Sequence, residues 1–539
     1  MKPLVFVLLV ATISIHACSE RDASKTTDAK RPNILIAISD DQSFAHTSFA
    51  GSRFVSTPAF DRVASSGIYF SNCFAGSPGC APSRSALITG RHHWQNEQSG
   101  QHAAGWFKKY VPVVDVLSAR GYYVGKTGKG VGPFRYAQDE ADSLLRRENA
   151  AGPDYSARKY DGDDDPRPAD GIRALDYAAN FADFIAERPV DSPFYFWYGA
   201  SEPHRRFEYQ SGSRAGKRLE DAQVPDFLPD VDTIREDLLD YALEIEWFDT
   251  HLGRMLDLLD SLGELDNTLV IVTSDNGMAF PRAKANAYDY GIHVPMAISM
   301  PSQFQGDRKI LDPIGFIDVT PTILDVTGVG PEGMLPVTGQ SLVPILSSSQ
   351  SGSIDAGRTY AYSGRERHSS TRWKNLGYPQ RAVRSETHLL IWNMKPERAP
   401  AGVPIMLDPE SGEPNPMHGL QDGRYLPGTA YHDIDDCPTK TFMIEQHEHS
   451  EYGQYFDWSM AHRPEFEFYD IEEDPYCLQN LYETDGYQEI ISEMQAALNR
   501  ELMETEDPRL TEVNPEIFDT YPRYSRMRSF PAPEWAGGE

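Results

Sequence analysis

The chain has 539 residues, 40% of them apolar, which is enough for one large domain with a sizeable core and a smaller domain beside it. Its formal charge is −30, from 50 basic and 80 acidic residues, which argues against nucleic acid or an anionic membrane as a general partner. An anionic ligand therefore requires a local group of Arg and Lys side chains.

The N-terminal segment predicts export and a tether. Lys2 precedes an apolar run over residues 4–15 that is too short to span a bilayer, and Cys18 follows soon after. This pattern is typical of a bacterial signal peptide over residues 1–18 that ends in a lipobox, with lipidation of Cys18; a plain signal peptide is the alternative. Residues 19–31 are polar, as in a tether. We expect a protein of the periplasm, or one held at the outer membrane only through its lipid anchor.

Three continuous apolar runs predict buried strands of a parallel sheet, at residues 33–39, 194–200 and 267–274. A helical pattern of apolar residues occupies about 233–262, between the last two runs. This alternation predicts an α/β fold, with a large doubly wound, mostly parallel sheet flanked by helices on both faces.

The character of the sequence changes near Gly377, and we expect a smaller C-terminal α+β subdomain over residues 379–539. A strand pair is predicted over 380–393, a further strand at 466–471 and a helix at about 486–504. The preceding domain accordingly occupies residues 32–378.

Polar side chains follow the carboxyl ends of the three predicted strands. They are Asp40 and Asp41 after the first, His204 after the second, and Asp275 and Asn276 after the third. Ligands of doubly wound sheets bind beyond the carboxyl ends of the strands, so these side chains predict a single pocket. Carboxylate and amide oxygens suit a calcium- or magnesium-type ion, although helix caps or surface turns are the alternative interpretation of each pair.

The densest motif is Cys80-Ala81-Pro82-Ser83-Arg84, followed by Thr89-Gly90-Arg91. It resembles the signature of the sulfatase family, and the resemblance implies that a separate formylglycine-generating maturation enzyme oxidises Cys80 to formylglycine (3-oxoalanine). A thiol would form a stable thiosulfate ester, whereas an aldehyde hydrate has one hydroxyl to attack sulfur and another whose deprotonation expels the product. A structural loop cysteine is the alternative.

The resemblance also implies an alkaline-phosphatase-like fold for residues 32–378, as the catalytic domain, and one Ca²⁺ ion, with Mg²⁺ as the alternative. The implied metal ligands are Asp40, Asp41, the modified Cys80, Asp275 and Asn276. Such an ion would bind a sulfate oxygen and lower the pKa of the hydrate, and Asp275 would take the proton of the nucleophile.

Basic side chains complete the site that the resemblance implies. Arg84 would orient the hydrate, and Lys129 and Lys284 match the lysine positions of the family, Lys284 on the sulfate. His204 resembles the histidine that protonates the leaving group or holds the sulfate; a polar surface or core histidine is the alternative.

One departure from the family pattern concerns the lysine segment. Sulfatases usually carry Lys-x-His there, and the histidine helps to expel sulfate, but Lys129 is followed by Gly-Val-Gly-Pro. We expect either that another residue such as His102 or His93 serves this step, or that the local alignment is shifted.

The resemblance spans nearly the whole chain after Arg31 and points to the N-sulfoglucosamine sulfohydrolase (heparan N-sulfatase) branch. It is carried by Trp94-Gln95-Asn96, by residues 202–205 and by residues 274–281. The implied substrate is a sulfated oligosaccharide or polysaccharide fragment that is being degraded, with a sulfate ester or sulfamate as the cleaved group. O-sulfated algal or host glycans are the alternative within the branch.

A basic loop over residues 363–378 is the expected substrate-binding segment, with His102 as a further candidate. Its candidate residues are Arg365, Arg367, His368 and Arg372. The planar guanidinium meets a uronate or a sulfate through two hydrogen bonds. A solvated basic turn is the alternative.

Two other functions stay open. A phosphatase or phosphonate monoester hydrolase could share the fold, but two-metal phosphatases need extra Asp and His ligands, whereas Asp275-Asn276 resembles the single-metal type. A non-catalytic lipoprotein that captures sulfated glycans would still bind them after Cys80→Ala, and its native form would release no sulfate.

Overall fold

The structure is a computed structural model. It describes residues 30–162, 165–415, 419–421, 424–426, 430–511 and 513–537. The predicted leader, the lipidation candidate Cys18 and nearly all of the tether lie outside the described residues. The chain divides into two units, residues 1–31 and 32–539, and the described helices and strands all belong to the second. No described helix is long and apolar enough to serve as a membrane span.

The larger sheet contains seven strands in the order β4-β5-β1-β6-β7-β2-β8. They are β1 (Asn33–Ser39), β2 (Ile68–Phe70), β4 (Tyr123–Gly128), β5 (Phe194–Gly199), β6 (Thr268–Ser274), β7 (Met296–Ser299) and β8 (Arg308–Ile310). β4, β5, β1 and β6 pair in parallel, whereas β7 is antiparallel to both of its neighbours. The predicted mostly parallel sheet is confirmed, and β7 is the strand that departs from it.

β1 shows why these strands read as continuous apolar runs. All seven of its residues are buried. Its alternate residues enter different cores: Ile34, Ile36 and Ile38 pack on one face of the sheet, and Leu35 and Ala37 on the other. Because both faces are covered, no position is free for a polar side chain until the strand ends.

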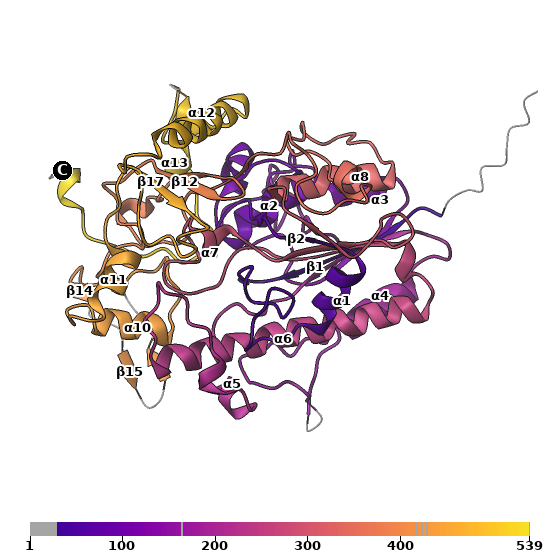
Figure 1. Cartoon of the computed structure of the whole chain (residues 1–539), viewed down its shortest axis with the longest axis horizontal. Helices are drawn as coiled ribbons and strands as arrows, with labels where there is room; N and C mark the ends of the chain where they lie inside the picture. Colours follow the sequence, from indigo (N-terminus) through magenta and orange to yellow (C-terminus); the bar gives the residue numbers. More distant parts are fainter. Residues whose placement is uncertain are drawn as a thin grey trace, which may run out of the picture. The chain divides into compact units, whose positions relative to one another are not determined.

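Helices cover both faces of this sheet, as Figure 1 shows. The first core draws on α2 (Cys80–Thr89), α3 (Val113–Ala119), α8 (Val319–Thr327) and α9 (Val343–Leu346). The second core draws on α1 (Pro58–Ser66), α4 (Tyr177–Glu187) and α6 (Asp232–Ser261). The doubly wound arrangement expected from the sequence is therefore present.

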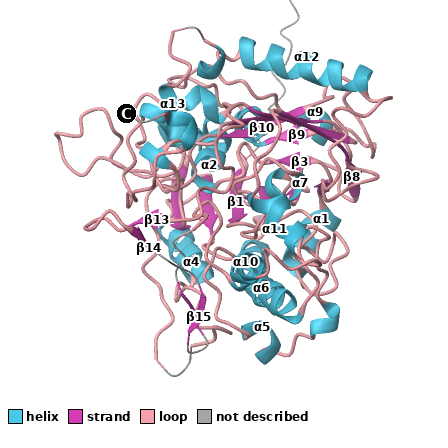
Figure 2. Cartoon of the chain, turned by 90° about the vertical axis from the view of Figure 1, so that its left-hand side faces the viewer, coloured by secondary structure: helices cyan, strands magenta, loops and turns pink. Residues whose placement is uncertain are grey.

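A second, antiparallel sheet has the order β10-β11-β12-β17. Its strands are β10 (Ala361–Arg365), β11 (Gln380–Arg384), β12 (His388–Asn393) and β17 (Phe466–Asp470). α12 (Gln488–Glu504) packs on β11 and β12, and Figure 2 shows it above the sheet that includes β10. β11, β12, β17 and α12 agree closely with the predicted elements. β10 was expected as part of a loop, and it pairs with β11 across the domain boundary proposed at residue 378, which stays a prediction.

The remaining elements are short. The strands are β3 (Cys73–Phe74), β9 (Ile314–Gly315), β13 (Met406–Leu407), β14 (Pro414–Asn415), β15 (Gly419–Gln421) and β16 (Arg424–Leu426). The helices are α5 (Ser211–Arg214), α7 (Asp289–Ile292), α10 (Pro438–Glu445), α11 (Gly453–Met460) and α13 (Ile517–Thr520). Single 3-10 turns occur as well, including η1 (His93–Gly100).

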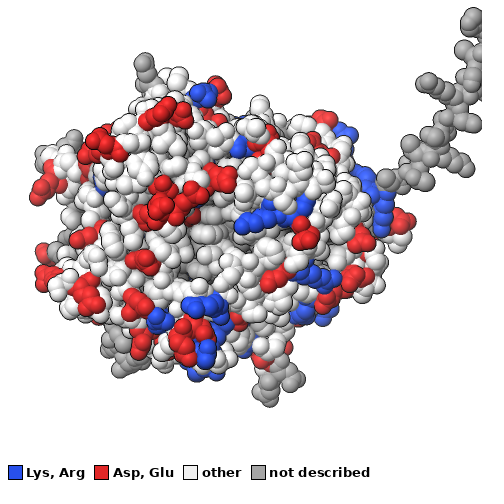
Figure 3. All heavy atoms as spheres, in the orientation of Figure 1, with Lys and Arg blue, Asp and Glu red and all other residues white. Residues whose placement is uncertain are grey.

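On the face shown in Figure 3, acidic side chains are spread widely, and basic ones gather in small groups among them.

Candidate active site

The centre of the site forms where β1 and β6 end side by side. The two strands are parallel and in register, with Ser39 opposite Ser274, so the residues that follow them emerge together. The Asp41 N–H donates to Asp275 Oδ1 (3.0 Å), and Asn276 Nδ2 donates to Asp41 Oδ1 (2.7 Å). Asp41 has a φ of 77°, a left-handed conformation that a short polar residue tolerates. All of these side chains are buried.

Cys80 joins this group from the first position of α2. Ligand atoms of Asp40, Cys80 and Asp275 all lie within 4.8 Å of one another. Every residue of α2 is buried, and Cys80 itself is 1% exposed. Burial raises the pKa of the Cys80 thiol to about 11, although the ammonium of Lys129 opposes the shift. An unmodified thiol here is protonated at neutral pH.

Two basic side chains neutralise these carboxylates. Lys129, directly after β4, donates from Nζ to both oxygens of Asp40 (2.7 and 2.6 Å). Arg84, one turn along α2, donates from Nε to Asp275 Oδ2 (2.7 Å). Burial alone would raise the pKa of Asp40, but the positive charges of Lys129, His204 and Arg84 together outweigh burial and lower it. Both carboxylates are thus held by cations in the interior.

A second group of charges surrounds Asp41. Lys284 donates from Nζ to Asp41 Oδ2 (2.6 Å) and to Asp435 Oδ2 (3.0 Å), while His204 Nε2 lies 3.9 Å from Asp41 Oδ2. Burial alone would lower the pKa of Lys284, but the two carboxylates raise it well above its usual range. The sequence had not indicated Asp435, which follows no predicted strand; its only signal is the short acidic run around it.

The site opens into a cavity of about 590 Å³. Its wall includes Asp40, Cys80, His102, Lys129 and His204. This volume lies within the range of small-ligand sites in proteins. The structure therefore brings the nucleophile candidate, two of its charged neighbours and two histidines to one accessible space.

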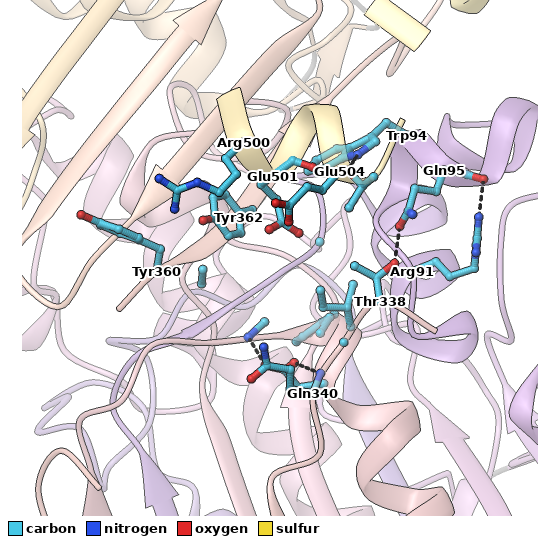
Figure 4. A pocket seen from close by; sticks show the side chains of 18 of the residues that line it. Arg91, Trp94, Gln95, Thr338, Gln340, Tyr360, Tyr362, Arg500, Glu501 and Glu504 are labelled. Atoms are coloured by element: carbon cyan, nitrogen blue, oxygen red, sulfur yellow. Dashed lines mark hydrogen bonds between the residues drawn. The ribbon is translucent and has the colours of Figure 1, made fainter. Parts of the chain in front are cut away.

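A larger cavity, of about 980 Å³, lies elsewhere (Figure 4). Trp94 and Gln95 of η1, Tyr362 of β10 and Arg500 of α12 contribute to its wall. None of the predicted catalytic or metal-binding residues, all of which the structure describes, lines it. Size therefore does not distinguish the candidate active site here, whereas the convergence of carboxylates, lysines and Cys80 does.

The basic residues expected in a substrate loop are buried. Arg365 and Arg372 are each 3% exposed, and both donate to Asp433 Oδ2 (2.8 and 2.6 Å). Arg367 donates to the carbonyl oxygens of Tyr521 (2.9 Å) and of the next residue (3.2 Å). These arginines do not form a solvated turn, and none of them lines the cavity beside Cys80. Their contact with a substrate stays a prediction.

The two histidines proposed for the missing Lys-x-His position differ in location. His102 lines the cavity together with Cys80, and its ring lies 5.0 Å from that of His368, centroid to centroid. Burial, and then the His368 ring, lower the pKa of His102 well below its usual range, so its imidazole is neutral. His93 contacts the Gly76 carbonyl (3.0 Å) and does not line the cavity. His102 is thus the better placed of the two.

The donor set fits a hard divalent cation. Asp40, Asp41 and Asp275 supply carboxylate oxygens, the ligand type that calcium and magnesium prefer. Asn276 Oδ1 is fully buried and has no hydrogen-bond partner among the described residues. Buried acceptors are almost always paired, so this oxygen marks a position for a ligand atom.

Comparisons with known proteins agree with this geometry. The sulfatase family model matches residues 32–329, more than half of the chain. An ulvan-active sulfatase of Formosa agariphila is 24% identical over 529 residues, which cover 92% of this chain and 79% of that protein. The N-sulphoglucosamine sulphohydrolase of Homo sapiens is 24% identical over 521 residues, which cover 89% and 91% of the two chains.

A solved structure shares the fold. It is that of a protein in complex with its substrate, D-glucosamine-2-N,6-O-disulfate, and superposes with a TM-score of 0.58 at 18% identity. The superposition covers 89% of this chain and 99% of that one. The resemblance found in the Cys80 motif is therefore confirmed at the level of the family: the chain belongs to the sulfatases, and it is a sulfuric ester hydrolase.

Proposed function

We propose that this enzyme removes sulfate from a sulfated glycan, with formylglycine made from Cys80 as the nucleophile and one calcium ion beside it. The observation that carries the proposal is the convergence of Asp40, Cys80 and Asp275 within 4.8 Å, next to Lys129 and Arg84. The glycan is supported by relatives named for ulvan and for N-sulphoglucosamine, and by the neighbour solved with a glucosamine disulfate.

The nucleophile depends on oxidation of Cys80 by a separate maturation enzyme. A buried thiol with a pKa of about 11 is a poor nucleophile at neutral pH, whereas the hydrated aldehyde supplies a hydroxyl. In this proposal Asp275 accepts the proton of that hydroxyl. Burial, and then the charge of Asp40, raise the pKa of Asp275, which suits a group that must take up a proton, and Arg84 Nε fixes its orientation.

His204 is suited to protonate the leaving group. Its Nδ1 lies 2.7 Å from the Arg205 carbonyl oxygen, which can only accept, so Nδ1 carries the hydrogen. Nε2 is the ring atom on the side of Asp41, and in the imidazolium form it can give up its proton while Nδ1–H stays bonded to the carbonyl. Lys129 and Lys284 then hold the sulfate oxygens, because each already brings an ammonium to a strand-end carboxylate.

Asp40, Asp41, Asp275 and Asn276 would hold the calcium ion, with magnesium as the alternative. When bound, the ion supplies positive charge to a sulfate oxygen. A second ion, as in two-metal phosphatases, is disfavoured. The other group of possible ligands includes Asp41 and Asp435, but Lys284 Nζ lies 2.6 and 3.0 Å from their carboxylates and takes the place of a second cation.

The position of the cleaved sulfate and the location of the enzyme belong to the same proposal. The relatives named for N-sulphoglucosamine and for ulvan are equally similar, at 24% identity, so an O-sulfate is the alternative to a heparan-type N-sulfate. We place the enzyme outside the cytoplasm, in the periplasm or at the outer membrane. This rests on the leader over residues 1–18 and the lipidation candidate Cys18.

The test is sulfate release by protein that has been co-expressed with a formylglycine-generating enzyme. We expect release from members of a panel of N- and O-sulfated disaccharides, and the aldehyde mass in the peptide that contains Cys80. Cys80→Ser should lower turnover at least about 10⁴-fold without loss of thermal stability. Cys73→Ala, which removes another buried thiol, is the matched control. A thiol mass in fully active protein would rule out the proposed nucleophile.

A further inference from the structure

The cavity that contains Cys80 has a second group of polar side chains in its wall. Glu244 of α6 lines the same space as Cys80 and Lys129, together with Arg173 from the loop before α4 and Arg206 from the loop after β5. None of these three residues takes part in the reaction proposed above.

Glu244 is a buried carboxyl group that no described residue pairs with. It is 2% exposed, its Oε1 is fully buried, and neither oxygen has a hydrogen bond or an ion pair among the described residues. The nearby guanidinium of Arg205 is already engaged, because it donates to both oxygens of Asp237 (2.6 and 2.9 Å). Burial, and then the charge of Glu202, raise the pKa of Glu244 well above its usual range. A protonated carboxyl group can both donate and accept a hydrogen bond.

Its neighbour Glu202 shows that the missing partner is particular to Glu244. Glu202 is equally buried, but it accepts from the Arg173 N–H (3.0 Å), the Tyr177 hydroxyl (2.8 Å) and the Ser201 N–H (3.1 Å). Buried polar groups of folded proteins are normally satisfied in this way. Glu244 instead lies in the wall of the active-site cavity, and no described residue uses its capacity for hydrogen bonds.

Neither arginine side chain donates a hydrogen bond within the part of the chain that the structure describes. The Arg173 side chain is exposed and has no hydrogen bond or ion pair among the described residues. The Arg206 side chain is 64% exposed, and its recorded carboxylate contact, Asp436, is 4.0 Å away. The neighbouring Arg205, by contrast, makes a close ion pair with Asp237 (2.6 Å). Two guanidinium groups without a close carboxylate among the described residues, on one cavity wall, are suited to an anion.

We propose that this part of the cavity wall is a sugar subsite, in which Glu244 hydrogen-bonds a ring hydroxyl and Arg173 and Arg206 bind an acidic substituent of the same substrate. The substituent is a carboxylate or a second sulfate. The inference rests on the proposed function, because it places the remainder of the glycan whose sulfate lies at Cys80. It makes the preferred substrate an acidic saccharide rather than a simple sulfate ester.

The ratio of kcat/KM for two substrates tests the subsite. Native protein, Glu244→Leu and the double variant Arg173→Gln/Arg206→Gln are assayed on a sulfated disaccharide that contains a uronate and on 4-nitrophenyl sulfate. We expect each variant to lower kcat/KM for the disaccharide at least about tenfold more than for the aryl sulfate. The effect of the arginine variant should shrink at high ionic strength, because exposed charges are screened.

Stability separates recognition from a structural role. Removal of an unpartnered buried carboxyl group should leave the Tm of Glu244→Leu unchanged or raise it. Glu236→Gln is the matched control, since Glu236 is also buried on α6 but accepts from Ser213 Oγ (2.6 Å) and does not line the cavity. Arg218→Gln controls for the arginines, because Arg218 is exposed and paired with Asp221 (2.8 Å).

Binding of the disaccharide to Cys80→Ser protein, measured by calorimetry, tests the subsite without turnover. Adding Glu244→Leu should weaken this binding at least about tenfold. Equal affinities, or equal losses of kcat/KM on both substrates, would overturn the subsite. If native protein released no sulfate from any substrate, the proposed function would fail, while the calorimetry would still decide whether Glu244 contacts the saccharide.

Discussion

Two buried clusters of charge in this enzyme look alike in composition and differ in what they leave unpaired. One is the strand-end site around Asp40 and Asp275. The other, here called the β11 network, consists of Arg381, Glu366, Asp507 and Arg509. In the network, Arg381 donates to Glu366 Oε1 (2.8 Å) and Asp507 Oδ2 (2.6 Å), and Arg509 donates to Glu366 Oε2 (2.6 Å). Its ion pairs are at most 2% exposed.

The difference lies in the remaining hydrogen-bonding capacity. The last nitrogen of Arg381, Nη1, donates to two backbone carbonyl oxygens, so the β11 network is saturated. At the strand ends, Arg84 Nη2 and Asn276 Oδ1 are buried without a hydrogen-bond partner among the described residues, and the cluster borders a cavity. Burial and charge density are therefore poor markers of a site, whereas unpaired polar atoms beside open space are good ones.

Metal removal should produce the largest difference between the two clusters. Exhaustive chelation is expected to lower sulfate release at least about 10³-fold, because the carboxylates of Asp40, Asp41 and Asp275 then lack the proposed cation. Added Ca²⁺ should restore activity, and a parallel addition of Mg²⁺ tests which ion the site prefers. Full turnover by protein in which elemental analysis detects no divalent metal would contradict the assignment of these ligands.

Disruption of the β11 network should affect stability instead of chemistry. Arg381→Met leaves Glu366 and Asp507 buried without their shared cation, and should lower the free energy of unfolding by about 3–5 kcal/mol. Denaturant titration measures this change. The folded fraction should retain kcat.

Lys109→Met is the matched control for Arg381→Met. It breaks an exposed pair with Glu97 and should cost at most about 1 kcal/mol. A loss of kcat in Arg381→Met as large as that of Cys80→Ser would mean that the comparison between the two clusters is wrong.

The smallest effect is expected at Asp435, which contributes to the site through its ion pair with Lys284. Asp435→Asn removes one of the two carboxylates that hold the Lys284 ammonium, and should reduce kcat/KM about tenfold, or about 1.4 kcal/mol. The neighbouring variant Asp436→Asn, whose carboxylate pairs with Lys440 (3.1 Å), should stay close to native. If both variants behave alike, Asp435 has no particular role.

The fold was largely predictable because its central strands are buried on both faces. β1, β5 and β6 read as continuous apolar runs, and each was expected within one residue of its observed bounds. β2, β7 and β8 have only three or four residues and no clear periodicity. β7 runs antiparallel to its neighbours β6 and β2, and the local sequence of β7 does not specify this direction.

The site was predictable where it follows strand ends and unpredictable where distant segments pack against it. Asp40 and Asp275 could be expected together because the ends of parallel strands meet at one edge. Asp435 reaches Lys284 across 151 residues of sequence, from a segment without regular structure. Likewise, Arg365 and Arg372 read as a basic loop, because their partner Asp433 lies 68 and 61 residues away from them.

The complete enclosure of α2 has a consequence for how the enzyme becomes active. Cys80 is 1% exposed and stands at the start of a helix whose ten residues are all buried. A second protein cannot bind this segment once the sheet and its covering helices have assembled. Under the proposed function, oxidation of Cys80 must therefore compete with folding, and we expect that a molecule which folds while still carrying the thiol is not activated by later exposure to the modifying enzyme.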